Sequence, residues 1–222
     1  YFSVRTNPQF LAMLDFHNAL PLLKEKKYQE ALTYLNAAAD RHKSTQIFLQ
    51  RAEAFTAIGR FEDPIDDANS ALEIDPDNPA AYLRRSIIYH RQNNEGLAIE
   101  EVNKAIQVDP KIPVAYNNRA WSYAALGSWQ TALEDCNKAL SLHPDYVPAL
   151  DTRGLCYLQL GELKLATDDL TKAMKAAPED GAAYYHRALV NERLGKDKEA
   201  AADRLEAQRL RYEPESWEAS LS

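Results

Sequence analysis

Proline recurs in this chain at an interval of 34 residues, at Pro76, Pro110, Pro144 and Pro178. Alanine keeps the same interval at positions 71, 105, 139, 173 and 207. A period of about 34 residues with helical patterning is typical of stacked two-helix repeats, in which each unit buries its apolar face against its neighbour. The spacing therefore predicts an all-α solenoid.

The prolines also divide the chain into units. Placing each proline near the end of a repeat gives units at 45–78, 79–112, 113–146, 147–180 and 181–214, preceded by a looser unit at 12–44. We expect residues 1–11 to form an N-terminal extension and residues 215–222 a C-terminal tail, whose Trp217 either folds back on the last unit or leads into a further domain. The chain begins at Tyr1, so an upstream segment also stays open.

Each unit carries the marks of two packed helices. In the first helix a small residue lies between two rings, as in Tyr116, Ala120 and Tyr123, which share one face at helical spacing. The small residue allows the second helix to approach closely. Between the helices the chain must leave the first helix through a left-handed residue. We expect that conformation at Gly59, Gly127, Gly161 and Gly195, and at Asn93 where asparagine replaces glycine.

Residues 116–144, YNNRAWSYAALGSWQTALEDCNKALSLHP, closely resemble a tetratricopeptide repeat. The resemblance extends over about six repeats and most of the chain. It implies a right-handed superhelical solenoid of stacked antiparallel helix pairs. It also implies that the first helices line a concave groove that binds a segment of a partner protein.

The composition narrows the classes of partner. A formal net charge of -7 opposes binding to nucleic acid or to an anionic membrane surface. No apolar run approaches the ~20 residues that a membrane-spanning helix needs, so we expect no direct membrane insertion. The two cysteines, Cys136 and Cys156, are expected to be small buried groups, with a disulfide between them as the alternative. No Asn-x-Ser/Thr site supports secretion, which favours a cytoplasmic location.

Catalytic and metal-binding patterns are absent from the sequence. There is no glycine-rich phosphate loop, HExxH helix, GxSxG turn or Cys/His nucleophile arrangement. The five histidines fall in separate parts of the repeat array, which gives no metal-ligand cluster. We therefore expect neither enzymatic activity nor a cofactor.

An arginine recurs in the first helices at the 34-residue interval, just before the small packing residue. Carboxylates recur at the same interval in the second helices, so each arginine has a predicted partner for a forked ion pair. We interpret this ladder as structural, although a row of arginines can also bind acidic ligands. The arginines are Arg51, Arg85, Arg119, Arg153 and Arg187, and the acids are Asp67, Glu101, Asp135, Asp169 and Asp203.

Binding residues are expected on the stripe of each first helix that runs beside the packing face. Trp121 is the predicted anchor, because aromatic side chains dominate binding energy when a partner buries them. The alternative is that Trp121 only covers the neighbouring unit. The full set of predicted groove residues is Leu49, Glu53, Leu83, Arg84, Ile87, His90, Arg91, Asn117, Asn118, Trp121, Asp151, Leu155, Tyr185, His186 and Leu189.

The first helix of the unit at 79–112 contains three arginines and no acidic residue. This local excess of positive charge suits an acidic or phosphorylated partner segment, unless Arg84, Arg85 and Arg91 are solvated surface groups. The carboxylate clamp by which related co-chaperones hold an EEVD tail is not expected. Only Asn118 matches it in the third to fifth units, and only Arg84 matches in the first three.

Three functions remain open. The chain is predicted to be an adaptor that captures a partner segment in its groove. It could instead be a homo-oligomeric scaffold that associates through the apolar segment FLAMLDFHNAL or through the tail around Trp217. It could also be the regulatory or targeting domain of a larger protein.

Overall fold

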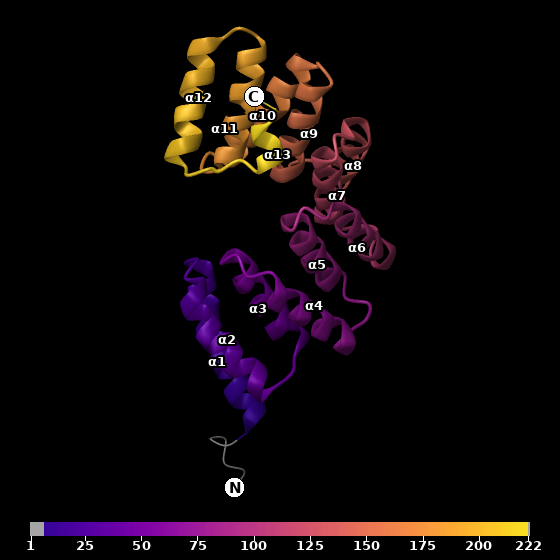
Figure 1. Cartoon of the computed structure of the whole chain (residues 1–222), viewed down its shortest axis with the longest axis vertical. Coiled ribbons are helices and arrows are strands. Elements are labelled where there is room, and N and C mark those ends of the chain that lie inside the picture. The colour runs from indigo at the N-terminus through magenta and orange to yellow at the C-terminus, as the bar shows by residue number, and fades with distance from the viewer. Residues whose placement is uncertain (1–6, 222) are drawn as a thin grey trace. The chain divides into compact units, whose positions relative to one another are not determined.

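The computed structural model describes residues 7–221, apart from the side chain of Glu62. Every regular element in this part of the chain is helical, as the repeat predicts (Figure 1). The helices are α1 (Pro8–Lys24), α2 (Tyr28–Arg41), α3 (Thr45–Ala57), α4 (Glu62–Ile74), α5 (Pro79–Arg91), α6 (Glu95–Val108), α7 (Pro113–Ala125), α8 (Trp129–Leu142), α9 (Val147–Gln159), α10 (Leu163–Ala176), α11 (Gly181–Arg193), α12 (Asp197–Arg209) and α13 (Ser216–Ala219).

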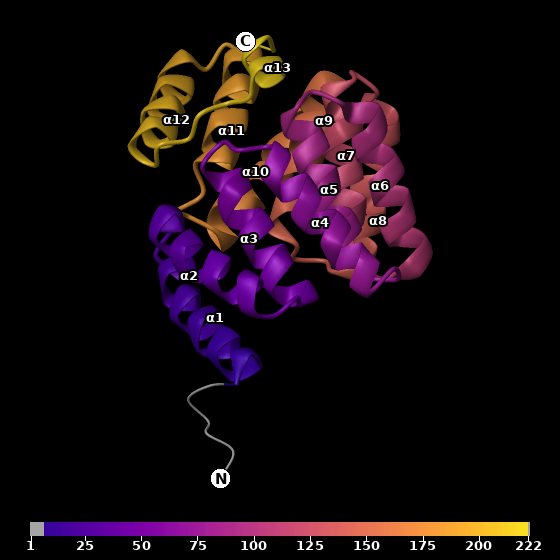
Figure 2. The same ribbon diagram turned by 60° about the horizontal axis from the view of Figure 1, so that its bottom comes forward.

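The helices form two compact units, which we call unit 1 (residues up to Pro110) and unit 2 (residues from Lys111). In unit 1 the antiparallel pairs are α1/α2, α3/α4 and α5/α6; α1 and α2 lie side by side in Figure 2. In unit 2 the pairs are α7/α8, α9/α10 and α11/α12. Each unit also brings first helices together, α3 with α5 in unit 1, and α9 with both α7 and α11 in unit 2.

Local chemistry sets the helix ends. The Asn78 side chain accepts a hydrogen bond from the backbone N–H of Ala81, and Pro79 follows at the first position of α5, where a missing N–H costs nothing. After α7 the chain turns through Gly127 with a φ of 72°, a left-handed conformation that a Cβ disfavours. Positive φ is likewise found at the other four predicted turn residues.

The first helix begins four residues before the predicted start of the first unit. Asn7 explains this earlier start, because its side chain accepts hydrogen bonds from the backbone N–H groups of Gln9 and Phe10, while Pro8 opens the helix. At the other end, the predicted tail contains the short helix α13, which lies beside α11 in yellow in Figure 1.

Close contact between paired helices depends on the small residues that the sequence singles out. An added Cβ on Gly154 of α9 would lie 2.6 Å from Cγ of Leu170 on α10. Leu170 is fully buried, so its side chain occupies the space that a larger residue would need. Ala120 holds the equivalent position on α7, where it packs in a cluster with Cys136 of α8 and Cys156 of α9. Both cysteines are buried free thiols, as predicted.

The arginine–carboxylate ladder is present at all five predicted positions. Arg51, Arg119, Arg153 and Arg187 each donate from Nε and Nη2 to the two oxygens of the predicted aspartate, over 2.6–3.1 Å. Arg85 donates to a single oxygen of Glu101. These carboxylates are buried and the arginines only partly so. The ladder therefore links the two helices of the five pairs from α3/α4 to α11/α12, and its arginines are occupied by structural partners.

Candidate functional site

The predicted binding residues of unit 2 come from three neighbouring first helices. Trp121 lies on α7, Asp151 on α9 and His186 on α11, and α9 contacts both of the other helices. We call the surface built on Trp121, Asp151 and His186 the first-helix face. Their neighbours on the same helices are Asn117, Asn118, Leu155, Tyr185 and Leu189.

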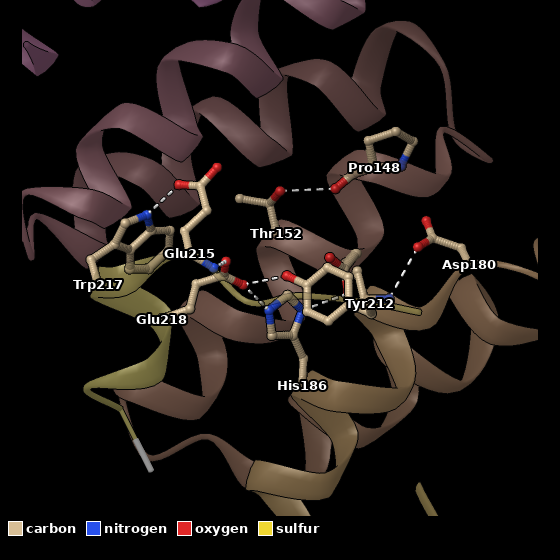
Figure 3. Close-up of polar contacts among 10 residues, drawn as sticks. Pro148, Thr152, Asp180, His186, Tyr212, Glu215, Trp217 and Glu218 are labelled. Atoms are coloured by element: carbon tan, nitrogen blue, oxygen red, sulfur yellow. Dashed lines mark hydrogen bonds and ion pairs between the residues drawn. The ribbon is translucent and has the colours of Figure 1, made fainter. Parts of the chain in front are cut away.

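The 212–221 segment folds back onto the first-helix face (Figure 3). After α12 the chain turns through Arg211, with a φ of 58°, and reaches Tyr212. At the start of α11, an added Cβ on Gly181 would lie 2.6 Å from Cβ of Tyr212, so only glycine leaves room for this passage. The segment then forms α13, whose capping box joins Glu215 and Glu218.

His186 is the centre of the polar contacts. Its Nδ1 lies 2.8 Å from Oδ1 of Asp151, and its Nε2 lies 2.8 Å from Oε1 of Glu218. The hydroxyl of Tyr212 donates to the same Glu218 oxygen over 2.6 Å (Figure 3). The side chains of His186 and Glu218 have no exposed surface. The segment thus places a carboxylate in the interior of unit 2.

Burial by itself would lower the pKa of His186, but the charges and hydrogen bonds of Asp151 and Glu218 outweigh it and raise the pKa from 6.5 to about 10. The imidazole is therefore protonated at neutral pH and donates from both nitrogens. Burial, followed by the charge of Glu218, also raises the pKa of Tyr212 above its usual value. Its phenol remains a hydrogen-bond donor at neutral pH.

Aromatic contacts hold the other side of α13. The ring of Trp217 meets Trp121 edge-on, with centroids 4.9 Å apart, and lies 6.2 Å from Trp129 at the start of α8. The indole N–H of Trp217 donates to Oε2 of Glu215 over 2.8 Å. Aromatic pairs in these geometries contribute about 0.5–1.5 kcal/mol beyond the burial of their surface. The sequence left the position of Trp217 open, and the structure places it on the first-helix face.

The remaining predicted residues of unit 2 differ in exposure. Leu155, Tyr185 and Leu189 are buried, and Trp121 is half-buried. On α7, Oδ1 of Asn117 and Nδ2 of Asn118 are buried, and neither has a hydrogen-bond partner among the described residues. Asn117 precedes Trp121 by four positions, so the two side chains leave the same side of α7.

In unit 1 the predicted residues are largely paired or packed. Leu83 is buried, and Leu49 and Ile87 are half-buried. Arg84 donates to Glu53 over 2.9 Å, so two predicted groove residues neutralise each other. His90 is 2.8 Å from Glu95, and Arg91 is exposed. The sequence predicted an excess of positive charge on α5. This prediction is wrong for Arg84 and Arg85, because each pairs with a carboxylate of a neighbouring helix.

Residues 7–221 contain no group of three or more His, Cys, Asp or Glu side chains able to hold a metal ion. Within the same range, none of the helices combines the length and the hydropathy that crossing a bilayer requires.

Three models described as tetratricopeptide repeat match this chain, over residues 18–79 and 49–113, 102–134, and 119–191. Together with the stacked helix pairs, these matches define a helical repeat protein of the interaction class. The chain belongs to the tetratricopeptide repeat family. The fold of this family is generally a non-catalytic scaffold for interactions between proteins.

Known relatives match parts of the chain. Sperm-associated antigen 1 of Mus musculus is 44% identical over 73 residues, or 33% of this chain. The Hsp70-Hsp90 organizing protein of Triticum aestivum is 29% identical over 68 residues, or 30% of this chain. These matches cover only 8% and 12% of the relatives' own lengths.

A solved structure shares the fold over nearly the whole chain. The tetratricopeptide repeat protein from Parabacteroides merdae has a TM-score of 0.79 and 23% sequence identity, covering 98% of this chain and 85% of that chain. At this level of identity the likeness shows the fold.

Proposed function

We propose that this protein is an adaptor that captures a segment of a partner protein on the first-helix face, with Trp121 as the anchor. The observation that carries the proposal is the contact between Trp121 and Trp217. The first-helix face already holds a short helical segment through an aromatic contact and a buried carboxylate, which is a recognised way of binding peptides.

An acidic or phosphorylated partner segment fits the charge of the first-helix face. In unit 2, the protonated His186 contacts a carboxylate from the 212–221 segment. Charge-assisted hydrogen bonds to anions are about twice as strong as neutral ones, so such groups add specificity to an apolar anchor.

Affinity capture from an extract of the source organism tests the adaptor function. The bait is the full chain, compared with Trp121→Ala and Arg84→Glu. We expect Trp121→Ala to lose the captured proteins and to keep the helical circular-dichroism signal of the unchanged chain. The matched control is Leu205→Ala, which removes an exposed apolar group from the second helix α12. Normal capture by Trp121→Ala would show that Trp121 is not the anchor.

Self-association through unit 1 is the second candidate. Phe10, Met13 and Leu14 of α1 are 40%, 62% and 48% exposed, and Phe10 and Met13 line a pocket of about 390 Å³ with Phe16 and Ile47. Contiguous exposed apolar side chains of this kind often mark interaction sites. Light scattering as a function of concentration tests the idea, and a monomer throughout the micromolar range contradicts it.

A further inference from the structure

The 212–221 segment contacts the first-helix face in the way a bound peptide would. It is joined to α12 through the turn at Arg211 and forms the one-turn helix α13. Two consecutive side chains of α13 make its main contacts with α7 and α11. Trp217 packs on Trp121, and Glu218 bonds to His186. α13 begins about one repeat interval after α11, but it ends after one turn and contacts α7, so the segment does not continue the regular stack of helix pairs.

Removing the 212–221 segment would leave groups of the first-helix face without their partners. His186 would keep Asp151 at Nδ1, but the N–H at Nε2 would lose its carboxylate. An occupant that covers this charged donor without bringing an acceptor leaves it buried and unsatisfied, which is costly. A replacement for the segment must therefore bring an acceptor, and a carboxylate meets the positive charge best.

The aromatic side chains of the first-helix face would also lose a partner. Without Trp217, the ring of Trp121 would lose its edge-on partner, and Trp129 would lose its neighbour as well. An aromatic side chain restores the buried area and the ring geometry together. On α13 the aromatic residue directly precedes the acid, so both groups are presented by a single helical turn.

Asn117 indicates that the partner segment is longer than α13. Its Oδ1 is buried, and none of the described residues hydrogen-bonds to it, the 212–221 segment included. Asn117 lies one helical turn before Trp121 on α7. A backbone N–H of an incoming segment that extends past Trp121 would satisfy this oxygen.

We propose that the 212–221 segment is an internal competitor that covers the partner site, and that the partner segment carries the same chemistry, an aromatic residue followed directly by an acidic one. This inference rests on the adaptor function proposed above. It adds the partner's recognition pattern and a mode of regulation, because a partner must displace Trp217 and Glu218 before it can bind.

Competition of this kind lowers the apparent affinity for a partner. A tethered segment acts at an effective concentration in the millimolar range for a short linker, so the first-helix face is covered most of the time. The apparent dissociation constant rises in inverse proportion to the uncovered fraction. Loosening the segment should therefore strengthen the binding of a peptide supplied from outside.

The test uses the full chain and a fluorescein-labelled peptide of residues 213–221, EPESWEASL. Fluorescence anisotropy measures its binding to the unchanged chain and to a Trp217→Ala/Glu218→Gln variant. We expect the variant to bind the peptide at least about tenfold more tightly. The matched control is Glu213→Gln, which neutralises an exposed carboxylate of the same segment and should bind like the unchanged chain.

Two altered peptides and one further variant of the chain test whether the contacts are specific. Peptides with alanine in place of tryptophan, or glutamine in place of the following glutamate, should bind the double variant at least about tenfold more weakly. Adding Trp121→Ala to the double variant should have the same effect. Circular dichroism of each chain verifies that unit 2 remains folded.

Equal peptide binding by the unchanged chain and the double variant overturns the inference, as does binding by neither. In that case, loss of captured proteins by Trp121→Ala would still support the adaptor function, so the two proposals fail separately. A dimer of the unchanged chain that disappears in the double variant would show that the segment is exchanged between two copies. That outcome would also overturn its assignment as a competitor of a partner.

Discussion

Glu218 and Asp151 approach His186 from opposite edges of its ring, with Oε1 of Glu218 2.8 Å from Nε2 and Oδ1 of Asp151 2.8 Å from Nδ1. Between two ionised carboxylates, only a protonated imidazole can donate at both nitrogens, and the raised pKa of His186 favours this charged form. The charge links α9, α11 and the 212–221 segment through one buried side chain. Loss of this charge should loosen the 212–221 segment, because the segment has only the one-turn helix α13 to pack against unit 2.

The contact of the 212–221 segment with unit 2 should therefore weaken at alkaline pH. The pKa of His186 rises from 6.5 to about 10 on folding, so its stabilising effect is complete below pH 6.5 and is lost as the pH rises to about 10. Tyr185 and Tyr212 also face the ring, and the raised pKa of Tyr212 keeps its phenol protonated over this range. NMR titration of the His186 ring and the Trp217 indole measures both events.

A Glu218→Gln variant serves as the control for this titration. It removes one of the two carboxylates that raise the pKa, so the His186 transition should move to lower pH. An identical titration curve in the variant would contradict the proposed role of Glu218.

Gly154→Ala should destabilise unit 2. The new methyl group would lie 2.6 Å from Cγ of Leu170, and overpacking of this kind costs about 1–3 kcal/mol. Replacing glycine by alanine in a helix recovers about 1 kcal/mol, which leaves a net loss of up to about 2 kcal/mol. Thermal unfolding followed by circular dichroism measures the change.

Gly96→Ala is the matched control, because Gly96 is also helical and an added Cβ would meet nothing within 4 Å. We expect it to be neutral or to stabilise the chain by up to about 1 kcal/mol. If both variants lower the unfolding temperature equally, close packing at Gly154 is not the cause.

The fold was predictable because its determinants recur within each 34-residue unit. Turn residues such as Asn93, and pairs such as Arg153 with Asp169, repeat with the period. Each of these determinants therefore occurs several times in this one sequence. The buried free thiols follow from the same pattern, since Cys136 and Cys156 occupy apolar packing positions.

The candidate site was predictable only in part. Trp121, Asp151 and His186 were all among the groove residues predicted on the first helices. Periodicity gave no indication of Tyr212 or Glu218, because the 212–221 segment breaks the repeat and contacts the face in a non-repeating way. The pairing of Arg84 with Glu53 was missed for a related reason, since their separation of 31 residues departs from the 34-residue interval.

The two thiols should resist chemical modification in the folded chain. Cys136 and Cys156 are fully buried, and the hydrogen bond with Cys156, followed by burial, raises the pKa of Cys136 well above its usual value. Both thiols are therefore inaccessible, and at Cys136 the reactive thiolate is also scarce. A chromogenic disulfide reagent should label neither residue in the folded chain and both in denaturant. Rapid labelling of the folded chain would contradict the packing of α8 against α9.

Breaking one rung of the arginine ladder should cost more stability than removing the whole rung. Arg153→Met leaves Asp169 buried and uncompensated, and we expect a loss of about 2–3 kcal/mol, since Arg153 is itself partly exposed. Asp169 keeps only a long contact of 3.7 Å with Lys172. In Arg153→Met/Asp169→Leu no buried charge remains, and an apolar pair fills similar space, so much of the loss should be recovered. Urea unfolding of both single variants and the double variant gives the coupling free energy. A double variant with the summed loss of the two single variants would mean that the two charges do not interact across α9 and α10.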